Sequence, residues 1–182
     1  PRKETILKLL TQCEGEIPEA FWQLNLAVLE DAVGRIDEYT GVLAPSPGWD
    51  ELLPIERQRL VSAAKRYVNE CHLSEVYLQP NTHHRPAAAG YRAIRLLFAE
   101  DQDAYKQLSE KNWNAWALPI LSFSANDGES EQEKQRQIAQ DCFHHAPDAF
   151  LSAVSEYLRI TNGINHVVHL VKGRANEALL EK

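Results

Sequence analysis

Apolar residues recur every three or four positions along most of the chain, which is the period of one face of an α-helix. The clearest example is the segment 18–39. Its main stripe, at steps of four, three, four and three, is formed by Trp22, Leu26, Leu29, Val33 and Ile36. A second stripe, which includes Phe21 and Val28, runs beside the first. Two adjoining apolar stripes predict a helix that is buried against more than one neighbour.

Eight further segments show the same period, and each is predicted to be a helix. The strong patterns cover 54–72, 87–99, 147–160 and 164–180, and the weaker ones cover 4–12, 102–111, 113–124 and 130–144. The stretch EVYLQ, 75–79, is the only candidate strand, and a single isolated strand would have no partner. The sequence therefore predicts an all-α fold.

Prolines stand at regular intervals near the starts of these segments, where their fixed φ and missing N–H suit the first helical turn. The series is Pro18, Pro54, Pro86, Pro119 and Pro147. Pro119 differs from the others because it lies inside a predicted helix, which we expect it to kink or interrupt. The successive spacings of 36, 32, 33 and 28 residues are close to the length of a helical-hairpin repeat.

The segments between the predicted helices are too short to mark a domain boundary. Turn-forming residues cluster at 40–50, 124–133 and 161–163. We therefore expect residues 1–182 to form a single all-helical repeat domain, in which antiparallel helical hairpins stack as a short solenoid. An irregular helical bundle is the alternative, because the proline spacings vary.

Composition points to a protein of the cytoplasm. No apolar run approaches the ~20 residues that a membrane span needs, and no secretion signal precedes the first helix. Cys13, Cys71 and Cys142 are far apart and odd in number, which favours free thiols in a reducing compartment. The chain begins with Pro1 and has no methionine, and the patterns of its first and last predicted helices resemble those of interior helices. We therefore expect a piece of a longer protein.

Charge is distributed unevenly, although the net charge of −7 argues against general nucleic-acid binding. The segment 54–99 carries seven basic and three acidic residues between two acidic blocks. Its basic side chains, a possible docking surface, are Arg57, Arg59, Lys65, Arg66, Arg85, Arg92 and Arg95. Arg92 and Arg95 share one helical face and are predicted to be exposed. Such a surface would suit an acidic protein segment or a phosphate-bearing ligand, or, alternatively, nucleic acid.

Two histidine pairs each precede a proline. His83 and His84 stand before Pro86, and His144 and His145 stand before Pro147. We interpret both pairs as parts of helix starts, because a metal needs three or four converging ligands and adjacent histidines point in different directions. His166 and His169 could share a helical face, without a third ligand nearby in the sequence. The alternative is a helical metal-dependent enzyme that uses the histidine pairs.

No phosphate-binding loop, dinucleotide fingerprint or nucleophile elbow occurs in the sequence, so we assign no catalytic residue, cofactor or metal ligand. Gly90 in AAAGYRA is expected to let a neighbouring helix approach closely. Trp113 and Trp116 are expected in the core, although they could line a pocket instead.

The stretch PAAAGYRAIRLLFAEDQDAYKQLSEKNWNAWALPILSF, 86–123, resembles the HEAT-type helical repeat in its paired-helix layout and its proline-disturbed helix. The resemblance implies a curved solenoid and no active residue. It also implies a fragment of a large multidomain protein, such as a bacterial signalling NTPase in which such arrays act as sensor or scaffold regions. We therefore expect a non-catalytic interaction or sensing scaffold whose partner is another protein or a neighbouring domain of the parent chain.

Overall fold

The computed structural model describes residues 2–15, 18–71, 73, 83–123, 128–161 and 163–171. Helices account for most of these residues, and the only extended pairing among them is one isolated bridge between Glu30 and Ile36. The prediction of an all-α fold is therefore confirmed. The candidate strand at 75–79 lies outside the described residues.

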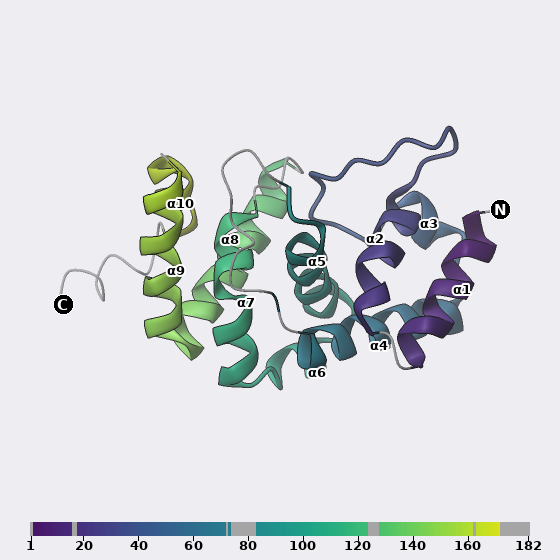
Figure 1. The fold of residues 1–182 in the computed structure, drawn as a ribbon, viewed down its shortest axis with the longest axis horizontal. Coiled ribbons are helices and arrows are strands. Elements are labelled where there is room, and N and C mark those ends of the chain that lie inside the picture. The colour runs from purple at the N-terminus through teal and green to yellow at the C-terminus, as the bar shows by residue number, and fades with distance from the viewer. Residues whose placement is uncertain are drawn as a thin grey trace.

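The described part of the chain forms one 3-10 turn and ten helices. These are α1 (Arg2–Glu14), η1 (Pro18–Ala20), α2 (Phe21–Leu29), α3 (Pro47–Asp50), α4 (Pro54–Glu70), α5 (Arg85–Glu100), α6 (Gln102–Lys106), α7 (Glu110–Ser122), α8 (Gly128–His145), α9 (Pro147–Ile160) and α10 (Ile164–Val171). They lie in a row from α1 at one end to α9 and α10 at the other (Figure 1). Packing passes along the row, since α1 contacts α2, α4 contacts α5, α5 contacts α7, and α7 contacts both α8 and α9.

The predicted helix 18–39 is wrong beyond residue 29. Helix α2 ends at Leu29, because the Asp31 carboxylate accepts hydrogen bonds from the backbone N–H groups of Val33 and Arg35, both at 2.9 Å, and so stabilises a turn instead. Gly34 lies within this turn and has a φ of +80°, which suits glycine. Residues 30–42, called the arm from here on, therefore leave the helix, and Val33 is 72% exposed.

Other boundaries differ less from the prediction. The expected loop 40–50 contains the short helix α3, which Ser46 caps by accepting a hydrogen bond from the Trp49 N–H. Helix α8 begins at Gly128, inside the expected loop 124–133. Helix α7 continues through Pro119 to Ser122, so the proline does not interrupt it. The end of the predicted helix 164–180 lies outside the described residues, which reach Val171.

The centre of the core is built where α5 meets α4 and α7. Trp113 and Trp116 are buried there, as expected for core residues, and the Trp116 indole N–H donates to the Val68 carbonyl at 2.9 Å. A Cβ atom added to Gly90 would lie 1.8 Å from the Trp116 ring. The expectation that Gly90 allows a close helix approach is therefore confirmed.

All three cysteines are unpaired, as expected, and all three are buried. Burial raises the pKa of Cys13 to about 11 and the pKa of Cys71 and of Cys142 to about 12. The thiols are therefore protonated at neutral pH, and a protonated thiol is a poor nucleophile. Among the described helices, none combines the length and the apolar character that crossing a bilayer requires.

Candidate functional site

Two basic residues of α4, Arg59 and Arg66, contact α1. Arg59 donates to both carboxylate oxygens of Glu14 on α1, at 2.5 and 2.8 Å. Arg66 donates to the Cys13 carbonyl at 2.8 Å, close to the end of the same helix. These two cations tie α4 to α1, so their charge is used within the fold.

The other two basic residues of α4 differ in environment. Arg57 donates to the Trp49 carbonyl at 3.1 Å, and its guanidinium lies 5.2 Å from the centre of the Trp49 ring. Lys65 is exposed to solvent. The four basic residues of α4 therefore do not share one binding face.

Two of the three arginines of α5 are buried, so the prediction that Arg92 and Arg95 are exposed is wrong. Arg92 is 1% exposed and donates to the backbone carbonyls of Thr40 at 2.8 Å and of Glu38 at 2.5 Å, both in the arm. Arg95 is 4% exposed and donates twice to one carboxylate oxygen of Glu131 on α8, at 2.6 and 2.9 Å. These arginines hold other segments against α5.

The burial of Arg92 and Arg95 follows from the composition of α5. Every residue from 87 to 97 is buried, and the two arginines are the only charged residues among them. A helix without a polar face is surrounded on all sides, so its few charges must find partners within the protein. Sequence reasoning noted the apolar neighbours of these arginines and still placed them in solvent.

The structure therefore does not bring the seven basic residues together as one docking surface. The six arginines among them contact α1, α3, the arm and α8 separately, and Lys65 is exposed to solvent. Arg85 lines an open pocket. The basic side chains of the segment 54–99, called the basic island from here on, thus mostly contact the acidic blocks before and after it.

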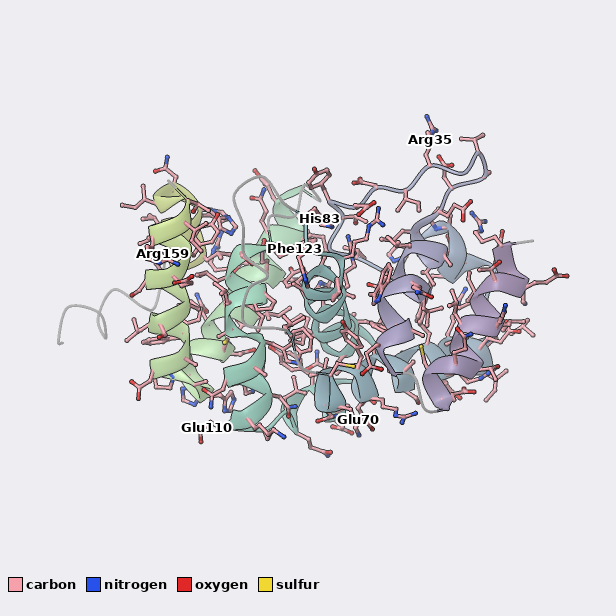
Figure 2. The ribbon with its side chains drawn as sticks, viewed as in Figure 1. Arg35, Glu70, His83, Glu110, Phe123 and Arg159 are labelled. Carbon is pink, nitrogen blue, oxygen red and sulfur yellow. The ribbon has the colours of Figure 1, made fainter. Side chains whose placement is uncertain are left out.

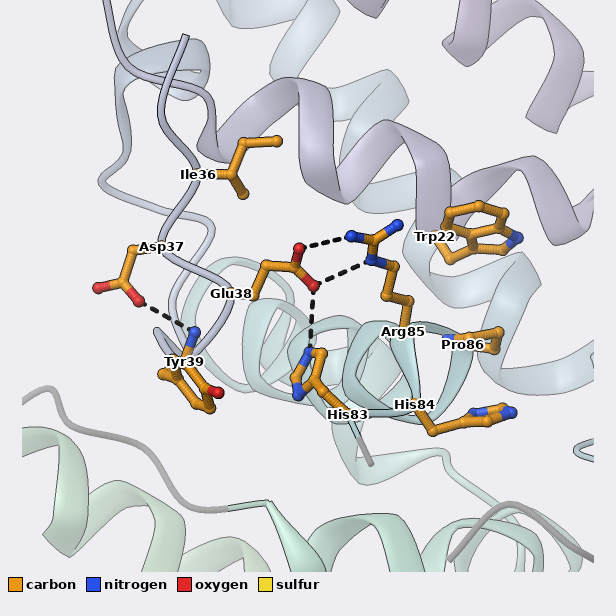
Figure 3. Close-up of a pocket in the computed structure, with 9 residues that line it drawn as sticks. All are labelled: Trp22, Ile36, Asp37, Glu38, Tyr39, His83, His84, Arg85 and Pro86. Carbon is orange, nitrogen blue, oxygen red and sulfur yellow. Dashed lines mark hydrogen bonds and ion pairs between the residues drawn. The ribbon is translucent and has the colours of Figure 1, made fainter. Parts of the chain in front are cut away.

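The pocket lies between the arm and the first turn of α5 and is open to solvent, with a volume of about 660 Å³. It is lined by Trp22, Ile36, Asp37, Glu38, Tyr39, His83, His84, Arg85 and Pro86. Figure 3 shows the Glu38 side chain pointing from the arm toward Arg85 and His83. The site thus combines residues from three places in the sequence: α2, the arm, and the start of α5.

One carboxylate dominates the polar side of the pocket. Arg85 donates to both oxygens of Glu38, at 3.0 and 2.7 Å, and the His83 Nε2 atom lies 3.6 Å from the carboxylate. The hydrogen bonds from Arg85 lower the pKa of Glu38 and outweigh the opposing effect of burial. Glu38 is therefore ionised at neutral pH, and it forms a charged fork with the guanidinium.

The two histidines of the pocket have different tasks. The His84 Nδ1 atom accepts a hydrogen bond of 3.3 Å from the Ala87 N–H and so caps α5, and the His83 ring lies 5.6 Å from the Tyr39 ring. Burial lowers the pKa of both imidazoles, so they are neutral at pH 7. The interpretation of this pair as part of a helix start is therefore supported by the contacts of His84.

The second histidine pair does not repeat this arrangement. His144 and His145 lie in the last turn of α8, not ahead of the first turn of α9, and the His145 ring stacks on Trp113 at 5.7 Å. The interpretation of this second pair as part of a helix start is therefore wrong, because α8 continues to His145 and the pair belongs to the end of that helix. Two imidazoles are too few to hold a metal ion, so a metal at this pair would need further ligands.

The last two histidines tie α10 to its neighbours. His166 Nε2 lies 2.8 Å from the Leu121 carbonyl, and the His169 carbonyl accepts a hydrogen bond from Arg136 at 3.2 Å. Burial lowers the pKa of His166, so its imidazole is neutral at pH 7. Within the part of the chain that the structure describes, no group of three or more histidine, cysteine, aspartate or glutamate residues could hold a metal ion.

Comparison with protein-family models, with curated proteins and with solved structures finds no match to this chain. The function is therefore argued from the chemistry of the pocket. Its aromatic rings, its guanidinium and its neutral imidazoles offer contact surface and directional hydrogen bonds.

Proposed function

We propose that the protein is a non-catalytic interaction module that binds a segment of another protein in the pocket between the arm and α5. One observation carries this proposal: the pocket joins Trp22, Tyr39 and Arg85 on an open surface. Tryptophan, tyrosine and arginine are the residues that contribute most often to the energetic centres of protein interfaces. Tyr39 is 56% exposed, so a partner could cover it and bury apolar ring surface.

The scaffold around the pocket suits such a role. The arm leaves α2 at Leu29, and buried Arg92 holds its backbone at Glu38 and Thr40. A held arm loses little conformational freedom when a partner binds, and this preorganisation favours affinity. Arg35 projects from the arm away from the helices (Figure 2), so the arm offers further surface around the pocket.

We also propose that the row of helices is a short HEAT-like solenoid that serves as a scaffold within a larger cytoplasmic protein. The sequential packing from α1 to α9 supports this arrangement, since each repeat of a solenoid contacts mainly its neighbours. The partner would then be a protein segment or another domain of the parent chain. The pocket would provide the specific contacts to that partner.

Selection from a random twelve-residue peptide library, displayed on phage, tests the binding function without requiring that the partner be identified first. The wild-type protein should enrich peptides that share a motif. Tyr39→Ala should bind these peptides about fivefold or more weakly, because it removes an exposed aromatic contact. Ile164→Ala is the matched control, since Ile164 is 60% exposed and lies on α10, and it should bind as the wild type does. Absence of a shared motif, or equal binding by both variants, would contradict the proposal.

A further inference from the structure

The Glu38 carboxylate occupies a position that a partner's side chain could also take. A guanidinium presents two parallel N–H groups that match a carboxylate, and Arg85 uses both on Glu38. The pair is accessible, since the side chain of Arg85 is 50% exposed and that of Glu38 is 25% exposed. Ion pairs in contact with water contribute little, so one carboxylate can be exchanged for another at small cost.

The arm does not depend on this ion pair for its position. Arg92, seven residues further along α5, donates to the Glu38 and Thr40 carbonyls, and it does so from a buried position. The backbone of residue 38 is therefore fixed by Arg92, whereas the side chain of residue 38 is held by Arg85. The side chain can turn toward solvent while the arm stays in place.

The charges around the pocket select the kind of anion. Arg85 and Arg92 are positive, Asp37 and Glu38 are negative, and His83 is neutral at pH 7 because burial lowers its pKa. The pocket therefore has no large positive excess. A partner's carboxylate brings one negative charge to Arg85, whereas a phosphate dianion would bring two into a pocket that has no positive excess.

We propose that Glu38 is an internal substitute for a partner's carboxylate, so that the pocket binds an acidic peptide whose aspartate or glutamate displaces Glu38 from Arg85. This inference rests on the proposed function of the pocket. It identifies the partner's chemistry: one acidic side chain for Arg85, beside an apolar or aromatic residue that packs on Trp22 and Tyr39. Glu38 then lowers the affinity of the free pocket, because every ligand must first displace it.

The peptides selected from the phage library test this inference. The enriched motif should contain aspartate or glutamate at one fixed position. Replacing that residue by asparagine or glutamine should weaken binding about fivefold or more. Glu38→Gln should strengthen binding about two- to fivefold, because the competing carboxylate is gone, and Arg85→Gln should weaken it. Binding is measured by isothermal titration with synthetic peptides.

The chain offers a matched control at its other end. Arg159 donates to both oxygens of Glu156 at 3.0 and 2.6 Å, and this pair also lies on the surface. Glu156→Gln and Arg159→Gln should leave the affinity unchanged. A motif without an acidic position, or a Glu38→Gln variant that binds no better than the wild type, would overturn the inference and leave the proposed function intact. A selection that enriches no motif would contradict both the inference and the proposed function.

Discussion

The first turn and the middle of α5 each carry an arginine that pairs with a glutamate, but the two arginines have different roles. The side chain of Arg85, in the first turn, is 50% exposed and pairs with Glu38 beside an open pocket. The side chain of Arg95, in the middle, is 5% exposed and pairs with Glu131 of another helix. Both form short hydrogen bonds to a carboxylate, so geometry alone does not distinguish them. Burial does, because a desolvated charge that loses its partner is costly, whereas an exposed one is solvated again.

This difference changes the interpretation of the basic island. A cation that holds two helices together is unavailable to a partner, however basic its segment is. Three of the acidic partners, Glu14, Glu38 and Glu131, belong to the acidic blocks before and after the island. The charge pattern along the chain therefore reflects contacts within the fold, and the first turn of α5 differs in that its Arg85 lines a pocket.

The largest expected effect is the loss of Arg95. Arg95→Gln should lower the free energy of unfolding by about 3 kcal/mol, because Glu131 is left in a partly buried site with only Lys134 as a cationic partner. Urea denaturation measures this change. Arg159→Gln, on the surface of α9, should leave the denaturation midpoint unchanged. An Arg95→Gln variant as stable as the wild type would contradict the structural role of the middle of α5.

A slightly smaller loss is expected from Gly90→Ala. In a helix interior, alanine is more favourable than glycine by about 1 kcal/mol. At this position, however, the added Cβ atom would overlap the Trp116 ring. Overpacking of this kind costs about 1–3 kcal/mol. The double variant Gly90→Ala with Trp116→Leu should lose less stability than the sum of the two single variants, as measured by urea denaturation. Additive losses would show that the two residues do not meet.

Acid should weaken the middle of α5 through Glu131. Burial alone would raise the pKa of Glu131, but hydrogen bonds from Lys134 and Arg95, together with their charges, lower it overall. Because the folded-state pKa lies below the ordinary value of about 4.5, the stabilisation is present above that value and is lost as the pH falls through the folded-state pKa. Glu131→Gln should therefore lose less stability than the wild type between pH 6 and pH 3.

The matched control for the acid experiment is Glu133→Gln, which removes a more exposed carboxylate from the same helix. This variant should keep the wild-type dependence of stability on pH. If Glu131→Gln and the wild type lost stability equally on acidification, the Arg95–Glu131 pair would not stabilise the fold.

The smallest effect on stability is expected at the first turn of α5. Arg85→Gln should leave the urea midpoint unchanged, because its side chain is half exposed and Arg92 still holds the arm. Arg92→Gln should lower the midpoint clearly, since it leaves buried carbonyl groups without their donor. Equal effects of the two substitutions would remove the distinction between the two parts of α5.

Helical periodicity was sufficient to predict the fold class and the places of most helices. The error at 30–39 has a local cause: the stripe continues through Val33 and Ile36, but Asp31 offers the backbone a competing set of hydrogen bonds. The available signal was Asp31 followed three residues later by Gly34, since aspartate and glycine are typical turn residues. The proposed solenoid arrangement, by contrast, depends on how hairpins stack, which periodicity does not specify.

The candidate site was less accessible to sequence reasoning. Arg85 was identified as one of the basic residues of 54–99, but its partner Glu38 lies 47 residues earlier, in a segment that was predicted to be helical. Trp22 and Tyr39 were assigned to no site. No local pattern links residues from α2, the arm and α5, because their proximity arises from the packing of α2 on α5 and from the hold of Arg92 on the arm.

The most direct test of this distinction is a nuclear magnetic resonance titration of the arginine side chains. The Nε–H groups of Arg85, Arg92 and Arg95 donate to Glu38, Thr40 and Glu131 respectively, so each reports on one contact. With protein labelled with ¹⁵N on arginine and a selected acidic peptide as ligand, the Arg85 resonance should shift as the peptide replaces Glu38, while those of Arg92 and Arg95 remain in place. A bound peptide that left Arg85 unshifted, or that shifted Arg92 and Arg95 equally, would contradict the account.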